Sequence, residues 1–280
     1  MSNAKLLSSK GAIEYLGIEK KEFENYFKFS KEIKGAKENG RFKFKKSDLD
    51  SWKKLKKQRT VILSLDEYEK CFEFAIKMAY GTRQSRGTGI RGARSEVQKA
   101  DDFILGILAE YGVQKFLKQK YKTKVELDTE VHLDHITEQD FIGIKEKGKI
   151  RPIKTRVAVK SSKWKNCFNV IDPLEYENPN RKSDVYIFVR VGLPSDHLFR
   201  ILREHSFFGK VKDFLEKEPD FRKISELKEI PIWIAGFSYH GEFDKVKSIP
   251  NQPFEDWRYV KAVGEMHNSD GAWKKFIKKL

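Results

Sequence analysis

The segment from Asp184 to Val191, DVYIFVRV, constrains the fold more than any other part of this sequence. It is almost continuously apolar and is rich in β-branched and aromatic residues, which favour strands. A half-exposed strand alternates polar and apolar residues, whereas a continuously apolar strand is buried on both faces. The segment therefore predicts a central strand in a sheet that is covered on both sides, as in an α/β fold.

The size and charge of the chain narrow the range of its partners. With 280 residues, of which 39% are hydrophobic, the chain is long enough for one large domain or two smaller ones. Its formal net charge is +16. Such an excess in a folded protein indicates a polyanionic partner, nucleic acid first and an anionic membrane surface second, although a lysine-rich proteome produces the same balance without such a partner.

Two further features indicate a soluble, cytoplasmic protein. No apolar run approaches the roughly 18 residues that a membrane-spanning helix needs, and the first residues lack a secretory pattern. Cys71 and Cys167 are isolated, so they match neither the paired-cysteine spacing of a zinc site nor a disulfide framework. We expect both to be reduced structural thiols.

Residues 1–58 have the pattern of a separate small domain. A pair of serines can cap a first helix that ends at Gly17, and a second short helix is expected from Lys20. The alternating segment Arg41–Lys45 follows an Asn-Gly turn and predicts a basic hairpin, after which Ser47 begins a closing helix. Helix, tight turn, helix, basic hairpin and helix together make a small winged-helix plan.

This segment resembles the excisionase-like helix-turn-helix modules in the stretches AIEYLGI and GRFKFKKSDLDSW. The resemblance covers about fifty residues and implies a second helix in the major groove of DNA, with the hairpin lying along the backbone. The alternative is a short basic domain that binds protein or only caps the next domain. The residues of the second helix that would contact DNA are Lys20, Lys21, Asn25 and Lys28.

The boundary between the two predicted domains and the start of the larger one carry many basic residues. The run KKLKKQR is a hinge or a helix extension, and residues 61–80 are predicted to form a helix introduced by Ser64 and Asp66. The next run, GTRQSRGTGIRGARSE, is too rich in glycine for a stable helix or strand. Such a loop suits phosphate binding, since glycine lets it mould to a duplex, but it is also compatible with a plain solvated loop. The candidate phosphate-binding residues are Arg83, Arg86, Arg91 and Arg94.

Three charged residues lie in elements that are otherwise mostly apolar. Glu110 occurs within a strongly periodic helix predicted over residues 99–119. The chain after it reads as a β-hairpin that turns at Lys147–Lys149, with Asp140 opening the first arm and Lys160 closing the second. In an antiparallel pair the start of one arm lies beside the end of the other, so we expect Asp140 and Lys160 to meet.

Together these residue types suit the hydrolysis of a phosphodiester. Hard oxygen ligands hold Mg²⁺, the metal lowers the pKa of a bound water, and a lysine can orient that water or stabilise developing charge. Each residue also has a structural interpretation: Glu110 as a partly exposed helix residue, Asp140 as a turn or cap residue, and Lys160 as a strand-end lysine that reaches solvent.

The order and spacing of these residues resemble the PD-(D/E)XK nuclease superfamily, which contains most type II restriction endonucleases. The resemblance rests on Glu110 in GILAEYGVQKFL, Asp140 in EQDFIGI and Lys160 in RVAVKSSK. It implies a nuclease domain over residues 59–280, with a core of a mixed β-sheet flanked by helices. It also implies that Glu110 and Asp140 bind Mg²⁺ and that Lys160 assists the attacking water.

The sequence departs from this family at Ala158, where the family usually carries Asp or Glu. A different acid can take its place, or a single Mg²⁺ can be held by Glu110, Asp140 and the main-chain carbonyl of Val159, or cleavage has been lost. The candidate replacement acids are Glu126, Asp128, Glu130 and Glu146.

The remaining segments extend the sheet and the basic surface. Residues 229–236 predict another strand, and the tail AWKKFIKKL predicts a basic amphipathic helix at the surface or at a DNA or dimer contact. Lys163 and Lys165 follow the lysine-bearing strand, where a DNA backbone would pass. His132 and His135 have no third partner nearby in the sequence and are weak zinc candidates.

These observations lead to one main hypothesis and two alternatives. The main hypothesis is a Mg²⁺-dependent, sequence-specific endonuclease of restriction type that cleaves duplex DNA and uses the N-terminal domain to recognise its site. Because both strands must be cut, a homodimer on a palindromic sequence is expected. The alternatives are a non-catalytic DNA-binding regulator or mobile-element factor with a degenerate nuclease fold, and an enzyme that acts on RNA.

Overall fold

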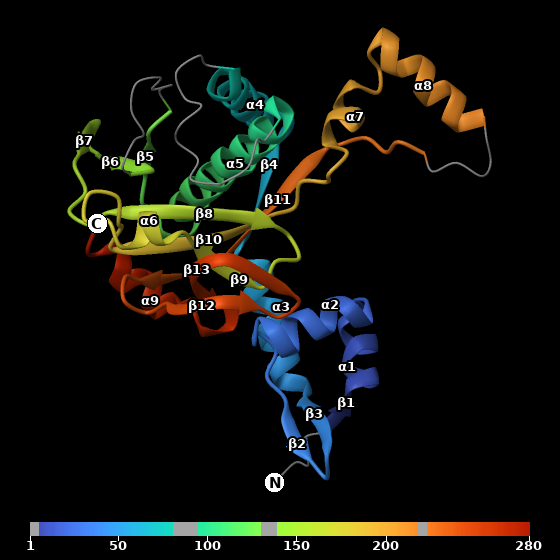
Figure 1. The fold of residues 1–280 in the computed structure, drawn as a ribbon, viewed down its shortest axis with the longest axis vertical. Coiled ribbons are helices and arrows are strands. Elements are labelled where there is room, and N and C mark those ends of the chain that lie inside the picture. The colour runs from blue at the N-terminus through green and yellow to red at the C-terminus, as the bar shows by residue number, and fades with distance from the viewer. Residues whose placement is uncertain (1–5, 81–94, 130–138, 218–222) are drawn as a thin grey trace.

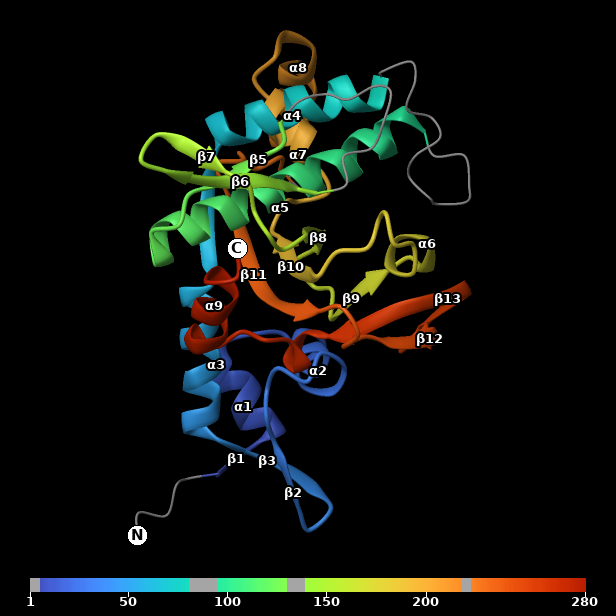
Figure 2. The same ribbon diagram turned by 90° about the vertical axis from the view of Figure 1, so that its left-hand side faces the viewer.

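The computed structural model of the chain describes residues 6–80, 95–129, 139–217 and 223–280. Figures 1 and 2 show an N-terminal unit at one end and a body built around a central sheet, and Figure 1 shows a helical arm that stands away from the body. The fold is of the mixed α/β class, as the sequence predicts.

The central sheet contains four strands in the order β4, β11, β10 and β8. β10 (Val185–Val191) pairs in parallel with β8 (Val157–Lys163) and antiparallel with β11 (Glu229–Tyr239). β4 (Thr60–Ser64) pairs antiparallel with β11. Every residue of β10 is buried, which confirms the predicted central strand, and β11 continues past the predicted end at Gly236.

The side chains of β10 alternate between two layers. Its valine and isoleucine side chains face the core that α4 (Leu65–Tyr80) and α5 (Glu96–Tyr121) cover. Tyr186 and Phe188 face the other way and pack in two smaller cores. The strand is buried on both faces because each of these layers covers one of them.

Helix α5 lies close against the sheet, with α4 packed beside it. A Cβ atom at Gly112 would lie 2.3 Å from the side chain of Ile232, so glycine is what allows α5 to approach β11 this closely. Ser64 and Glu67 bond each other's main-chain N–H groups at the start of α4, which confirms the predicted cap. Residues 61–64, predicted as the first helical turn, belong instead to β4 (Thr60–Ser64), because a short apolar run suits a strand as well as a helix.

A second sheet covers the opposite face of the central sheet. It is made of β9 (Phe168–Ile171), β13 (Gln252–Ala262) and β12 (Asp244–Ile249), and the short helix α6 (Pro173–Tyr176) follows β9. The basic tail forms α9 (Asp270–Ile277), an amphipathic helix that buries two aromatic side chains in the main core.

A third, small sheet carries the predicted hairpin. β6 (Phe141–Glu146) pairs with β5 (Val125–Leu127) on one side and with β7 (Lys149–Arg151) on the other, and the turn falls at Lys147–Gly148 as predicted. The predicted pairing of β6 with the strand of Lys160 is wrong. Pro152 follows β7 directly and removes a main-chain donor, so the hairpin ends there and β8 joins the central sheet.

The N-terminal unit has the predicted order of helix, turn, helix, hairpin and helix. Ser8 caps the first helix, Gly17 ends it in a left-handed conformation, and the hairpin turns at Asn39–Gly40. The last helix runs without interruption to Gln58, so KKLKKQR is a helix extension and not a hinge. The elements are β1 (Leu6–Ser8), α1 (Ser9–Leu16), α2 (Lys20–Glu24), the π-helix η1 (Asn25–Phe29), β2 (Ala36–Glu38), β3 (Arg41–Lys45) and α3 (Lys46–Gln58).

A buried ion pair holds this unit to the body. Arg190 of β10 donates from its two terminal nitrogens to the carboxylate of Glu32, at 3.1 and 2.8 Å, and the two side chains are 0% and 6% exposed. The Arg190 guanidinium also lies 4.4 Å from the centre of a Trp233 ring. Beside it, the Lys56 ammonium of α3 lies 4.9–5.3 Å from the ring centres of Tyr26, Trp52, Trp164 and Trp233.

The helical arm consists of α7 (His197–Leu202) and α8 (Ser206–Lys217). Its base is anchored by His197, whose Nδ1 is 2.7 Å from the Tyr68 hydroxyl and whose Nε2 is 3.1 Å from Asp101. Among the helices that the structure describes, none combines the length and apolar character needed to cross a membrane.

We expect Arg190→Met to lower the free energy of unfolding by about 3–5 kcal/mol, because it leaves the Glu32 carboxylate buried without its partner. Replacing both residues by Met should recover most of that loss. Urea unfolding measures these values. The control is Lys10→Ala, which breaks an exposed ion pair with Glu14 and should cost less than about 0.5 kcal/mol. An Arg190→Met protein as stable as the control would contradict the role of the pair.

Candidate active site

Asp140 lies immediately before β6 and reaches the edge of β8. Its Oδ2 accepts a hydrogen bond from the main-chain N–H of Val159 at 2.6 Å. In a strand the N–H and C=O groups of one residue point to the same side. The carbonyl of Val159 therefore also faces the edge at which Asp140 lies. The predicted proximity of Asp140 to the lysine-bearing strand is present, but a side chain makes it instead of two paired hairpin arms.

Glu110 approaches this edge from α5. Burial raises the pKa of its carboxyl group well above the ordinary value, the negative charge of Asp140 raises it further, and the positive charge of Lys160 lowers it. In the part of the chain that the structure describes, no side chain donates a hydrogen bond to Glu110. The three residues singled out in the sequence therefore lie close enough to act on one another electrostatically.

Lys160 has a partner that the sequence analysis missed. Its Nζ lies 2.6 Å from Oε1 of Glu175, and the two side chains are 27% and 22% exposed. Glu175 belongs to α6, which Asp172 caps by accepting a hydrogen bond from the N–H of Leu174. The sequence DPLEY signals the start of a short helix, but nothing in it indicates that this helix folds back onto β8.

The site contains more negative than positive charge. Burial raises the pKa of Asp140. The charge of Lys160 and the hydrogen bond from the N–H of Val159 lower this pKa, and the charges of Glu175 and Asp128 raise it again. Asp128 also raises the pKa of Glu110. Several half-buried carboxylates thus surround one ammonium group, an arrangement that favours an additional cation.

Ala158 faces away from Glu110. It is buried in a small apolar core with Tyr176 and Tyr186, on the side of the sheet opposite α5. A carboxylate at this position would be buried against aromatic rings, which is costly without a partner. Lys160 lies on the same face of β8, two residues further along, where α6 supplies Glu175.

The four acids considered as replacements for residue 158 have different positions. Asp128 is close enough to act on both Glu110 and Asp140. Glu146 lies at the far end of β6 and pairs with Arg151 at 3.4 Å, so it does not belong to the site. Glu126 stands opposite Gly143 within the small sheet. Glu130 lies outside the described residues.

The residues present fit Mg²⁺ better than a metal that needs a full cage of side chains. Across residues 6–80, 95–129, 139–217 and 223–280, no three Asp, Glu, His or Cys side chains are grouped as a metal site. Mg²⁺ commonly binds through one or two carboxylates and keeps several waters. Glu110 and Asp140, with the Val159 carbonyl facing the same edge, provide that number of oxygen ligands.

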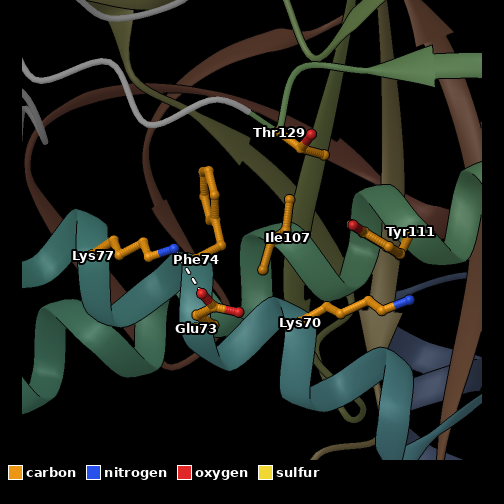
Figure 3. A pocket seen from close by; sticks show the side chains of 7 residues that line it. All are labelled: Lys70, Glu73, Phe74, Lys77, Ile107, Tyr111 and Thr129. Atoms are coloured by element: carbon orange, nitrogen blue, oxygen red, sulfur yellow. Dashed lines mark hydrogen bonds and ion pairs between the residues drawn. The ribbon is translucent and has the colours of Figure 1, made fainter.

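A small pocket lies between α4 and α5 (Figure 3). It holds about 150 Å³, whereas pockets for small organic ligands hold roughly 300–1,000 Å³, so it does not suit a nucleotide. Its lining residues are Lys70, Glu73, Phe74, Lys77, Ile107, Tyr111 and Thr129.

The candidate DNA-binding residues of the N-terminal unit lie on two connected helices. Lys20 and Lys21 are exposed on α2. Asn25 and Lys28 lie on the π-helix that continues α2, which the sequence did not predict. The main-chain carbonyl of Asn25 accepts a hydrogen bond from the Cys167 thiol of the body at 3.6 Å. Lys28 pairs with Glu24 at 3.2 Å.

The two candidate lysines at and just after the end of β8 are exposed. Lys163 lies 3.8 Å from Asp101 and keeps 60% of its side chain accessible, and Lys165 is also accessible. Both are therefore available to a phosphate. The predicted roles of Arg83, Arg86, Arg91, Arg94, His132 and His135 concern positions outside the described residues.

No protein-family model, curated protein or solved structure matches the chain. The chemistry of the site therefore rests on its own residues.

We expect Glu110→Gln to stabilise the protein at neutral pH. The pKa of Glu110 is raised in the folded state, so folding favours the protonated, neutral form of its carboxyl group. The stability contributed by this neutral form is lost as the pH rises through the raised pKa, whereas glutamine stays neutral at every pH. The gain in melting temperature, roughly 2–4 °C per kcal/mol, should be largest near pH 8 and should shrink below pH 5. The exposed Glu14→Gln is the control. A Glu110→Gln protein that melts below the wild type at pH 8 would show that the charged Glu110 carboxylate does not destabilise the folded protein.

Proposed function

We propose that the protein is a Mg²⁺-dependent, sequence-specific endonuclease that cleaves duplex DNA, of the restriction type. The observation that carries the proposal is the convergence of Glu110, Asp140 and Lys160, from three separate segments, at the edge of β8. A structural interpretation of each residue alone does not account for a Glu110 carboxyl whose pKa is raised by burial and by Asp140, beside a lysine that lowers it. Perturbed groups of this kind concentrate at functional sites.

Each residue has a role in this proposal. Glu110, Asp140 and the Val159 carbonyl would hold the metal. Bound there, Mg²⁺ would polarise the scissile phosphate and lower the pKa of a water molecule. The ammonium group of Lys160 orients the attacking water or stabilises the charge that develops on the phosphate.

Glu175 supplies a carboxylate near Lys160 that partly replaces the acid absent at residue 158. Its carboxylate holds the Lys160 ammonium in place at 2.6 Å and adds to the negative potential around Asp140. It acts through Lys160, so we assign it as a positioning residue. The absence of an acid at Ala158 is thus compatible with catalysis.

The N-terminal unit would recognise the DNA as a winged helix-turn-helix. The exposed Lys20 and Lys21 on the second helix and the basic hairpin β2–β3 support this assignment. The exposed Lys163 and Lys165 would contact the phosphates of the DNA backbone near the site. A homodimer would supply the second active site that cleavage of both strands needs.

A second candidate function is a non-catalytic DNA-binding protein with a degenerate nuclease fold. It is favoured by Ala158, which is buried in an apolar core, and by the engagement of Lys160 in an ion pair. Incubation of plasmid and phage DNA with the protein, in Mg²⁺ and then in EDTA, separates the two. Discrete fragments that need Mg²⁺ support the endonuclease, and binding without cutting supports the second candidate.

We expect Lys160→Ala to reduce cleavage by at least about 100-fold, since general acid–base and charge-stabilising groups contribute about that much. DNA affinity, measured in Ca²⁺ by gel shift, should change little. The matched control is Lys154→Ala, an exposed lysine outside the site. If Lys160→Ala cleaves at the wild-type rate, the site assignment is wrong.

Glu175→Gln should slow cleavage by roughly 10–100-fold, the usual effect of removing a group that orients another one. Glu175→Asp should restore part of the rate, because it keeps the charge. The loss should appear in kcat, with little change in KM. Glu177→Gln is the matched control, because Glu177 ends the same helix but pairs with Lys245. Equal rates for the Gln and Asp variants at residue 175 would argue against a positioning role.

A further inference from the structure

The arm formed by α7 and α8 carries an apolar surface that the rest of the described chain leaves uncovered. α8 has no buried residue, and the arm stands clear of the body in Figure 1. Phe207 and Val211 are one helical turn apart, so they share one face of α8. The exposed apolar side chains of the arm are 37–68% accessible and include Phe199, Ile201, Leu202, Phe207 and Val211.

The arm has a defined structure in spite of this exposure. Phe199 of α7 packs edge-on against Phe208 of α8, with ring centres 5.6 Å apart. At the base, the hydrogen bonds of His197 with Tyr68 and Asp101 attach α7 to both long helices of the body. The apolar surface is therefore presented in a fixed position.

The charge of the arm differs from that of the whole protein. Residues 196–217 contain five Lys and Arg and four Asp and Glu, a net charge of +1 in a chain of +16. Much of this charge is paired within the arm, as in the pairs Arg200–Asp196 and Lys212–Glu204. A balanced surface of this kind suits neither a phosphate backbone nor an anionic membrane, both of which select an excess of Lys and Arg.

The size of the surface suits a symmetric contact. A large apolar side chain presents roughly 150–250 Å² when fully exposed, so these five expose about 500 Å² per copy. Two copies would bury about 1,000 Å² of apolar surface, and with the usual apolar share of about 60% the whole contact reaches roughly 1,600 Å². That is the size of a standard specific interface.

We infer that the arm is a self-association surface, at which the α7–α8 arms of two copies pack against each other around a two-fold axis. The occupant is a second copy of the chain. Two copies repel each other over the rest of their surface, which carries a net charge of about +15, but they can meet at the arms, which are nearly neutral and apolar. This contact would form the homodimer of the proposed function. The inference rests on the arm itself and holds whatever reaction the protein carries out.

The test is the mass of the full chain in solution, measured by light scattering and sedimentation between about 1 and 100 µM. The wild type should be a dimer. Phe207→Glu/Val211→Glu should weaken dimerisation by roughly 100-fold or more, since buried anchors dominate such contacts. Phe207→Lys/Val211→Lys should do the same. Both variants should fold, because the two positions are exposed in one copy.

Two further measurements sharpen the result. A mixture of the Glu and Lys variants should regain a heterodimer, because opposite charges then face each other across the axis. Glu216→Gln, on the opposite face of α8, should leave the dimer unchanged. A wild-type monomer at 100 µM, a dimer that survives both double variants, or a mixture that stays monomeric would each overturn the inference. A dimer that cuts no DNA would overturn the proposed function and leave this inference standing.

Discussion

The buried pair of Arg190 and Glu32 is the interaction on which the arrangement of this protein depends. Arg190 lies on the central strand β10, fully buried, and stands in register with Ser162 of β8, two residues beyond Lys160. Burial removes its guanidinium from solvent, so Glu32 and the ring of Trp233 must be in place for the sheet to be stable. The N-terminal unit is therefore fixed to the same pair of strands that carries the candidate active site.

The candidate site shows the opposite balance of charge. Arg190 is matched by one carboxylate, whereas Lys160 is surrounded by several, and burial raises the pKa of both Glu110 and Asp140. Such a group of carboxylates costs stability in the protein alone, and a bound cation would offset that cost. A structural ion pair and a proposed metal site thus lie a few residues apart on β8 and β10 and differ in how completely their charges are compensated.

The elements themselves were predictable wherever local pattern decides structure. The apolar run of β10, the periodic helix with Glu110, the hairpin turns and the order of the N-terminal helices all follow from spacing, caps and turn residues. Predictions failed where a distant contact decides. β4 is a strand because β11 is there to pair with it, and β8 joins β10 instead of β6. The continuation of α2 as a π-helix had no signal in the sequence.

The sequence by itself determined which residues could do chemistry: Glu110, Asp140 and Lys160 are recognisable from their types and their places in apolar elements. Only the tertiary structure decided how they meet. Asp140 reaches β8 through one hydrogen bond to Val159, and Glu175 joins Lys160 from a helix that the sequence does not connect to it. The reason is physical, since secondary structure follows from neighbours along the chain, whereas ion pairs and buried charges depend on which surfaces the fold brings together.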